Sequence, residues 1–282
     1  MNILHITDIH FGPYHWQVDD GLIIDRINNF APDIILNTGD LTSDSLSEEF
    51  RQARDFLAKL ECKNIVSIMG NHDKYSKRSH EMFREYIYDG DFVKPKDVTK
   101  LSKKKVFINS KTAILQDYFT EINYLREFEI KGKKILVICV ETSQYQDDDG
   151  RVEPQILDAL SDEIAKRQFD QALLLTHHSV LSTDECPLIN SQRVVDFIHK
   201  NQIQASFCGH THELEMVEVK DLVRGTKFRQ FMCGSLSSLN IPRESNMFCT
   251  YENFGSQNEI ITVTRILPTD SGVEFNQTII GG

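Results

Sequence analysis

The sequence has no apolar run long enough to span a bilayer, and its opening stretch, MNILHITDIH, lacks the basic region and the apolar stretch of a signal peptide. Basic residues are few, because 31 Lys and Arg stand against 42 Asp and Glu and give a formal net charge of -11. This acidic balance argues against a broad electropositive surface for nucleic acid, although it allows a local cationic site. We therefore expect a cytoplasmic protein without a membrane partner.

The cysteines show none of the close spacing that marks a zinc-binding or redox motif. No two of them form a CxxC pair, and most stand in or beside apolar runs. Reduced thiols in a packed core, as in cytoplasmic proteins, explain this pattern better than a disulfide framework does. The six residues are Cys62, Cys139, Cys186, Cys208, Cys233 and Cys249.

Short apolar runs alternate with amphipathic stretches, which is typical of strands joined by helices in an α/β fold with a mainly parallel sheet. Amphipathic periodicity predicts helices over 45–61, 155–168 and 191–201, with their apolar stripes in the core. We predict strands at about 2–7, 33–38, 64–69, 134–140, 171–176 and 204–208.

Two parts of the chain depart from this alternation. Between about 92 and 133 the sequence contains short strand-like pieces, which we interpret as extra strands of a sheet. From about 213 it becomes rich in short strands, which predicts a second sheet packed against the first. No linker composition or internal repeat divides the chain, so we expect a single domain over residues 1–282.

Polar side chains follow five of the predicted strands, at the point where each strand ends. Because the carboxyl ends of parallel strands lie at one edge of a sheet, these loops are expected to converge. A glycine precedes the polar residues in three of the loops, which lets the backbone turn sharply and approach a ligand. The polar residues are Asp8 and His10; Asp40; Asn71, His72 and Asp73; His177 and His178; and His210 and His212.

Carboxylate, amide and imidazole donors without a thiolate suit Mn, Fe, Zn, Co or Ni better than Ca or Mg. Seven such ligands are too many for one transition ion. Two ions about 3.5 to 4 Å apart that share a bridging carboxylate would use them all, and such a pair is suited to displacement at phosphorus. A lone DxH or HxH is more often a turn or a surface histidine, so the prediction depends on all five loops occurring together.

The motifs DIH, GDLT, GNHD, THHS and GHTH, in this order over about residues 2–212, resemble the calcineurin-like metallophosphoesterase superfamily. The resemblance implies a four-layer α/β/β/α sandwich of two mixed sheets, with two divalent or mixed-valence metal ions at the strand ends and Mn, Fe and Zn favoured. It implies that Asp8, His10 and His212 hold one ion, that Asn71, His177 and His210 hold the other, and that Asp40 bridges them.

The resemblance also suggests how a phosphoester would be hydrolysed. A hydroxide bridging the two ions would attack phosphorus in line with the departing alkoxide. His72, which is not a ligand in the family, would stabilise the developing charge or protonate the leaving oxygen, and Asp73 could orient its ring. Strand alternation favours His177 over His178 as the ligand, which leaves His178 as a candidate for supporting the ligands from behind or for contacting the substrate.

The compact arrangement is similar to bacterial cyclic-nucleotide and glycerophosphodiester phosphodiesterases, so we expect a phosphodiesterase whose phosphoester substrate includes nucleotides as one option. The stretch ITDIHFG also resembles double-strand-break-repair nucleases, and a non-catalytic scaffold with the same fold is a further alternative. Trp16, in FGPYHW, either stacks on a base or closes the first loop as a hydrophobic plug. Arg243 is a candidate contact for a phosphate oxygen.

Overall fold

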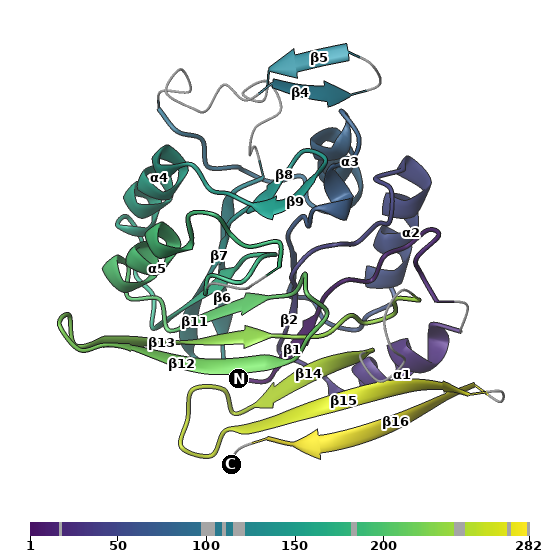
Figure 1. The fold of residues 1–282 in the computed structure, drawn as a ribbon. Helices are drawn as coiled ribbons and strands as arrows, with labels where there is room; N and C mark the ends of the chain where they lie inside the picture. The colour runs from purple at the N-terminus through teal and green to yellow at the C-terminus, as the bar shows by residue number, and fades with distance from the viewer. Residues whose placement is uncertain are drawn as a thin grey trace.

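Two mixed sheets form the centre of the molecule (Figure 1). The computed structural model describes residues 1–16, 19–96, 105–108, 111–114, 122–181, 185–239, 246–269 and 272–280, with only the backbone of 105–108 and 111–114. The first sheet has the order β16 (Gly272–Ile279), β15 (Ile260–Thr269), β14 (Met247–Glu252), β1 (Ile3–Ile6), β2 (Ile34–Asn37) and β3 (Ile65–Ser67). The second has the order β12 (Glu215–Asp221), β13 (Thr226–Met232), β11 (Ala205–Cys208), β10 (Gln171–Leu175), β7 (Lys133–Cys139) and β6 (Tyr124–Ile130).

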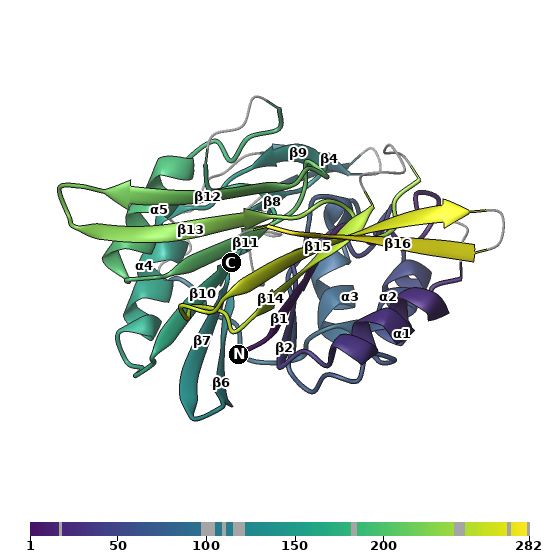
Figure 2. The same cartoon turned by 90° about the horizontal axis from the view of Figure 1, so that it is seen from below.

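Helices cover the outer face of each sheet (Figure 2). The first sheet is covered by α1 (Gly21–Phe30), α2 (Ser47–Leu57) and α3 (Ser79–Tyr86), and the second by α4 (Pro154–Ile164) and α5 (Ser191–Lys200). These layers confirm the predicted four-layer α/β/β/α sandwich. Among the described residues, none of the helices combines the length and the apolar character needed to cross a bilayer.

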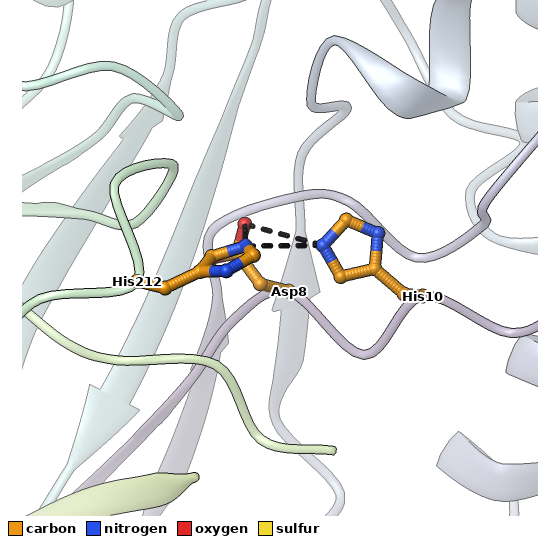
Figure 3. Close-up of side chains that lie close together, drawn as sticks. All are labelled: Asp8, His10 and His212. Carbon is orange, nitrogen blue, oxygen red and sulfur yellow. Dashed lines mark hydrogen bonds and ion pairs between the residues drawn. The ribbon is translucent and has the colours of Figure 1, made fainter. Parts of the chain in front are cut away.

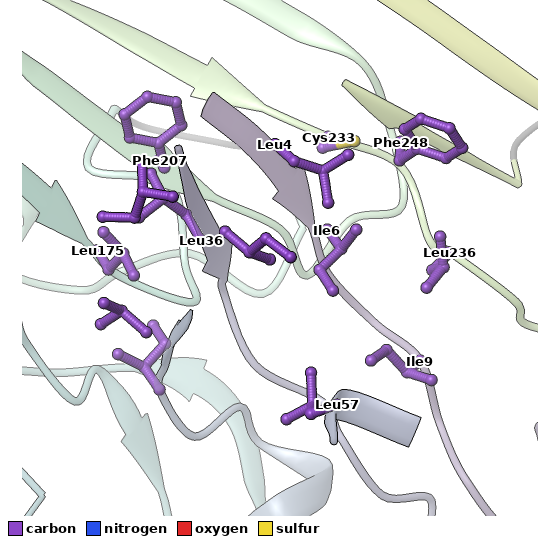
Figure 4. Close-up of a cluster of buried hydrophobic side chains, with 14 of the residues drawn as sticks. Leu4, Ile6, Ile9, Leu36, Leu57, Leu175, Phe207, Cys233, Leu236 and Phe248 are labelled. Atoms are coloured by element: carbon purple, nitrogen blue, oxygen red, sulfur yellow. The ribbon is translucent and has the colours of Figure 1, made fainter. Parts of the chain in front are cut away.

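Parallel strands buried on both faces explain the unbroken apolar runs of the sequence. All four residues of β1, β2 and β11 are buried. Leu4, Ile6 and Leu36 of the first sheet belong to the same cluster as Leu175 and Phe207 of the second (Figure 4). A second cluster lies between the second sheet and α4 and α5. The strand ends are thus held in a rigid core.

One part of the predicted topology is wrong: the parallel strands do not form one sheet. Strands β1, β2 and β3 are parallel to one another in the first sheet, and β7, β10, β11 and β13 are parallel in the second. The strand-rich part after 213 also forms no sheet of its own. Strands β12 and β13 extend the second sheet, whereas β14 to β16 extend the first, with β14 antiparallel to β1.

Between about 92 and 133 the expected extra strands are present in two places. Strand β6 pairs with β7 at the edge of the second sheet, whereas β4 (Lys105–Ile108) and β5 (Lys111–Ile114) form a separate two-stranded ribbon. The sequence patterns missed a second ribbon, made of β8 (Ser143–Gln144) and β9 (Asp147–Gly150), and a 3-10 turn at His72–Lys74. Both lie in loops that follow strand ends, close to the predicted ligands.

Candidate metal centre

Backbone hydrogen bonds fasten the first two ligand loops to each other. The Asp8 amide donates to Gly39 O over 2.9 Å, and the His10 amide donates to Asp40 O over 2.9 Å. Asp8, His10, Asp40, His210 and His212 all have positive φ values, between 50° and 78°. Non-glycine residues rarely adopt this left-handed conformation, and such strain is concentrated at functional sites. The backbone conformation of these loops is therefore typical of a functional site.

Glycine is required where these loops approach one another. Gly39 has a φ of 106°, and a Cβ there would lie 2.8 Å from Nδ1 of His177 and 2.7 Å from the amide nitrogen of Gly70. At Gly209 an added Cβ would lie 2.3 Å from Oδ2 of Asp8. The glycines noted in the sequence thus allow loops from the two sheets to come into contact.

The first predicted ligand group is assembled from both sheets (Figure 3). Nε2 of His212 lies 3.2 Å from Oδ1 of Asp8 and 3.1 Å from Nε2 of His10. Oδ1 of Asp8 is buried and accepts no well-aligned hydrogen bond from the described residues. A buried carboxylate oxygen without a full partner is costly, and a cation would satisfy it. This donor set fits a metal ion.

The second predicted group also joins the two sheets. Oδ1 of Asn71 lies 2.9 Å from Nε2 of His177 and 3.1 Å from Nδ1 of His210, and these two nitrogens are 3.2 Å apart. Nδ1 of His177 lies 2.8 Å from Thr38 O, which can only accept, so Nδ1 carries a proton and Nε2 faces the group. The structure therefore places His177 among the predicted ligands.

Asp40 lies between the two groups. Its Oδ2 is 3.7 Å from Nε2 of His10 and 3.5 Å from Nε2 of His177. Its Oδ1 accepts a hydrogen bond from the His72 amide over 2.9 Å, which fixes the carboxylate. This is the position that a bridging ligand would occupy.

The electrostatics of the centre favour a cation. Burial lowers the pKa of His177, but Asp40 outweighs this effect and raises it to about 9, so the carboxylate favours positive charge at this nitrogen. Burial lowers the pKa of His10 to about 4, and burial together with His177 does the same for His210. Those two imidazoles are therefore neutral near pH 7, which is the state that binds metals.

His72 lies beside the first group and Asp40, and a ring nitrogen of His72 is within 4.8 Å of ligand atoms of His10 and Asp40, so these three side chains could also hold an ion. Nδ1 of His72 lies 2.8 Å from Ser43 O and donates to it, which leaves Nε2 free to act on a substrate. Its ring contacts His10, Tyr14 and Tyr75, with centroid distances of 4.8, 5.6 and 5.1 Å. Tyr75 was not identified from the sequence, because nothing in its local pattern distinguishes it from a packed tyrosine.

The prediction that Asp73 orients the His72 ring is wrong. Asp73 is fully buried, and its carboxylate accepts hydrogen bonds from the amides of Leu41, Thr42 and Gly70 over 3.1, 2.9 and 2.9 Å. It also accepts one from the Thr42 hydroxyl over 2.8 Å. Burial and the charge of Asp40 raise its pKa to about 7. Asp73 thus joins the loops that carry Asp40 and Asn71.

The two candidate substrate contacts, His178 and Trp16, are buried. His178 is 0% exposed; its Nε2 lies 2.9 Å from the Asp148 carbonyl oxygen on the β8–β9 ribbon, and its ring packs against that of His210 with a centroid distance of 4.2 Å. Trp16 is 3% exposed, and its indole N–H donates to Asp20 over 3.0 Å. Neither side chain offers a surface to a substrate in this conformation, so these two assignments are corrected, and Trp16 fits the plug interpretation. Arg243 lies outside the described residues.

A pocket of about 750 Å³ opens over the centre. Asp40, Asn71, His72, His210 and His212 line it on one side. The rest of its described lining includes four further acidic residues and neither lysine nor arginine. These acidic residues are Asp148, Glu185, Glu213 and Glu215.

Comparison with known proteins finds two relatives of similar sequence. A relative from Synechococcus, named as a probable cyclic nucleotide phosphodiesterase, is 22% identical over 196 residues, which are 68% of this chain and 62% of the relative. A probable glycerophosphodiester phosphodiesterase from Arcobacter nitrofigilis is 26% identical over 217 residues, or 74% of this chain and 65% of that protein. The chain therefore spans just under two thirds of the length of both relatives.

The fold itself is also found among solved structures. A Staphylococcus aureus protein, described provisionally as a 5′-nucleotidase, superimposes with a TM-score of 0.50 at 11% identity, over 99% of this chain and 54% of that one. The family model of calcineurin-like phosphoesterases matches residues 1–214, which include all five ligand loops. The resemblance of the five motifs is thereby confirmed, and the chain belongs to the calcineurin-like phosphoesterase family.

Proposed function

We propose that this protein is a metal-dependent phosphodiesterase that hydrolyses a P–O bond of a small phosphodiester. The observation that carries the proposal is the place of Asp40, whose Oδ2 lies 3.7 Å from His10 of one ligand group and 3.5 Å from His177 of the other. A carboxylate between two three-residue groups of oxygen and nitrogen donors is the arrangement expected of a dinuclear centre.

The residues divide into three roles. Asp8, His10 and His212 would hold one transition metal ion, and Asn71, His177 and His210 the other, with Asp40 shared between them. When bound, the two ions would supply an activated water as the nucleophile and would neutralise charge on the phosphate. This donor set suits Mn, Fe, Zn, Co or Ni, and among these the family resemblance favours Mn, Fe and Zn.

His72 would act on the phosphate directly. The hydrogen bond from its Nδ1 to Ser43 O fixes the ring, and the contact with His10 keeps it beside the centre. As an imidazolium, with a proton on each ring nitrogen, its Nε2 could then donate a hydrogen bond to a phosphoryl oxygen, or a proton to the departing alkoxide.

The charge of the pocket supports a small diester over the other phosphoesters. A diester carries one negative charge, whereas a monoester carries up to two and a nucleic acid many. The acidic residues at the pocket, Asp148, Glu185, Glu213 and Glu215, repel the more highly charged substrates more strongly. The names of the two relatives, both of small-diester phosphodiesterases, agree with this choice.

The test is hydrolysis of bis-p-nitrophenyl phosphate by protein loaded with Mn, Fe, Zn, Co or Ni, with p-nitrophenyl phosphate as the monoester comparison. We expect faster turnover of the diester and loss of at least about 10²-fold in Asp40→Ala, as is typical when a group that stabilises the transition state is removed. Asp25→Ala, which removes an exposed carboxylate on α1, is the matched control and should retain full activity.

Three outcomes would contradict the proposal. Absence of turnover with every metal would favour the scaffold alternative. Cleavage of single- or double-stranded DNA without hydrolysis of small diesters would favour the nuclease. A preference for the monoester would leave a phosphoesterase of a different substrate class.

A further inference from the structure

We propose that Asp148, on the β8–β9 ribbon, is a positioning residue that fixes the side-chain amide of Asn71 with its oxygen toward the second ligand group. The inference rests on the proposed metal centre, because it concerns how one of the ligands is presented. Neither the family motifs nor the sequence patterns identify Asp148.

The first step is the orientation of the Asn71 amide. Nδ2 of Asn71 donates to Oδ1 of Asp148 over 2.9 Å, while Oδ1 of Asn71 points at His177 and His210. An amide has one acceptor end and one donor end, so rotation by half a turn would aim the NH₂ group at the place of the ion. Asp148 accepts only, so it binds the NH₂ end and opposes this rotation.

The second step is what holds Asp148. His178 is fully buried, and its Nε2 lies 2.9 Å from the Asp148 carbonyl oxygen, which can only accept. Nε2 therefore carries the proton, and Nδ1 accepts from the Thr142 hydroxyl over 2.8 Å. Both ring nitrogens of this neutral imidazole thus have a hydrogen-bond partner, and the bond from Nε2 fixes the backbone of the ribbon at Asp148.

The third step is the packing of the ribbon on this histidine. Gly150 lies so close to the ring that an added Cβ would be 2.6 Å from Cγ of His178. The Gly150 amide donates to Pro187 O over 2.9 Å, and the Arg151 amide donates to Thr142 O over 2.7 Å. The ribbon is therefore attached at several points to the strand ends of the second sheet.

This arrangement gives the two consecutive histidines different tasks. His177 faces the ligand group, whereas His178 supports the residue that orients another member of that group. Asp148 itself is exposed and lines the pocket, and it belongs to none of the potential metal-binding clusters among the described His, Cys, Asp and Glu side chains. Its effect on the centre is thus indirect, through Asn71.

The experiment measures metal binding in the absence of substrate. Full-length protein stripped of metal is dialysed against increasing Mn²⁺, and the ions bound per chain are counted for wild type, Asp148→Ala, Asp148→Asn and Asp149→Ala. We expect Asp148→Ala to bind one ion as wild type does and the second about 10- to 100-fold more weakly, the usual loss when a group that orients a ligand is removed.

The other two variants separate the hydrogen bond from charge. The amide oxygen of Asp148→Asn can still accept from Asn71, so both ions should bind within a few-fold of wild type. Asp149→Ala removes one negative charge from the same ribbon without touching Asn71 and should also bind both. Circular dichroism of each variant checks that the fold is retained.

The proposal is overturned if Asp148→Ala binds both ions as tightly as wild type does. It is equally overturned if Asp149→Ala loses as much affinity, because general charge would then be the cause, or if Asp148→Asn behaves like Asp148→Ala. Wild-type protein that binds fewer than two ions would overturn the proposed function as well. If wild type and all variants bind two ions equally well, only the role of Asp148 is contradicted and the proposed function is unaffected.

Discussion

Nζ of Lys74 lies 2.7 Å from Oε1 of Glu141, and both side chains are almost completely shielded from water. Nε2 of His80 lies 3.0 Å from the same oxygen, and Nζ also donates to Ser143 O over 3.0 Å. Because Lys74 belongs to the turn after Asn71 and Ser143 begins the β8–β9 ribbon, this buried ion pair joins two segments that flank the candidate centre.

The first prediction is that Lys74→Met destabilises the protein strongly. Loss of the ammonium leaves the Glu141 carboxylate buried without its main partner, and breaking a buried pair in this way typically costs about 3 to 5 kcal/mol. Urea denaturation measures the change in the free energy of unfolding. The control is Lys59→Met, the same substitution at an exposed lysine. It should change the free energy of unfolding by less than about 0.5 kcal/mol.

Removing both charges should be tolerated better than removing one. The double variant Lys74→Met with Glu141→Leu leaves no charge unpaired between these two positions, so we expect it to be more stable than Lys74→Met alone. A double variant that is less stable than Lys74→Met would show that the ion pair does not explain the loss.

The second prediction concerns acid stability. Burial raises the pKa of Glu141, but Lys74 and His80 outweigh it and lower the pKa from 4.5 to about 2. A depressed carboxyl pKa contributes stability that is fully present above the unfolded value and is lost as the pH falls toward the folded one. Between about pH 5 and 2 the free energy of unfolding should therefore fall by about 3 kcal/mol because of this group.

The check is a comparison of acid unfolding in wild type and Glu141→Gln. The variant lacks the titrating group, so its stability should depend less steeply on pH over this range. Equal slopes for the two proteins would mean that Glu141 is not held in its ionised form by Lys74 and His80.

The third prediction tests whether Asp73 joins the loops that carry Asp40 and Asn71 or instead orients the His72 ring. In Asp73→Asn an amide nitrogen replaces one accepting oxygen, so a buried donor among Leu41, Thr42 and Gly70 loses its acceptor, at a cost of about 1 to 3 kcal/mol. The thermal midpoint should fall, and metal affinity should weaken because the loops carrying Asp40 and Asn71 separate.

The pH dependence of diester hydrolysis provides the contrast. Ser43 O, and not Asp73, accepts the hydrogen bond from Nδ1 of His72. The pH profile of kcat should therefore keep its shape in Asp73→Asn even where its height falls. A shift of the profile by a full pH unit would instead restore the interpretation that Asp73 orients His72.

The fourth prediction is that metal stabilises the fold. Each ligand group combines residues of both sheets, so an ion would bind the folded protein and hardly the unfolded chain. Mn²⁺ at about 100 times its dissociation constant should stabilise the protein by about 2.7 kcal/mol per site. Differential scanning fluorimetry with Mn²⁺ and with EDTA measures the shift, which should shrink in Asp40→Ala. An equal shift with Ca²⁺ would contradict the donor chemistry.

The convergence of the candidate ligand residues could be predicted from the sequence because each loop displays its chemistry locally, directly after an apolar strand. The division of the strands between the two sheets could not be predicted, because it depends on pairings between segments that are distant in the sequence, such as Ile3 with Tyr251. The role that we propose for Asp148 was missed for a related reason. An acidic run such as QDDDG has no periodicity that distinguishes a solvated carboxylate from one that binds a buried amide.

The pairing of β1 with β14 has a consequence for biosynthesis. The strand that leads into Asp8 and His10 is made before one of its two neighbours, Met247–Glu252, which comes much later in the sequence. Proteins grow from the N-terminus, so this edge of β1 has no partner until β14 has been made. We expect the centre to assemble late, which makes bound metal a marker of completed folding and the region 1–214 by itself an incomplete molecule.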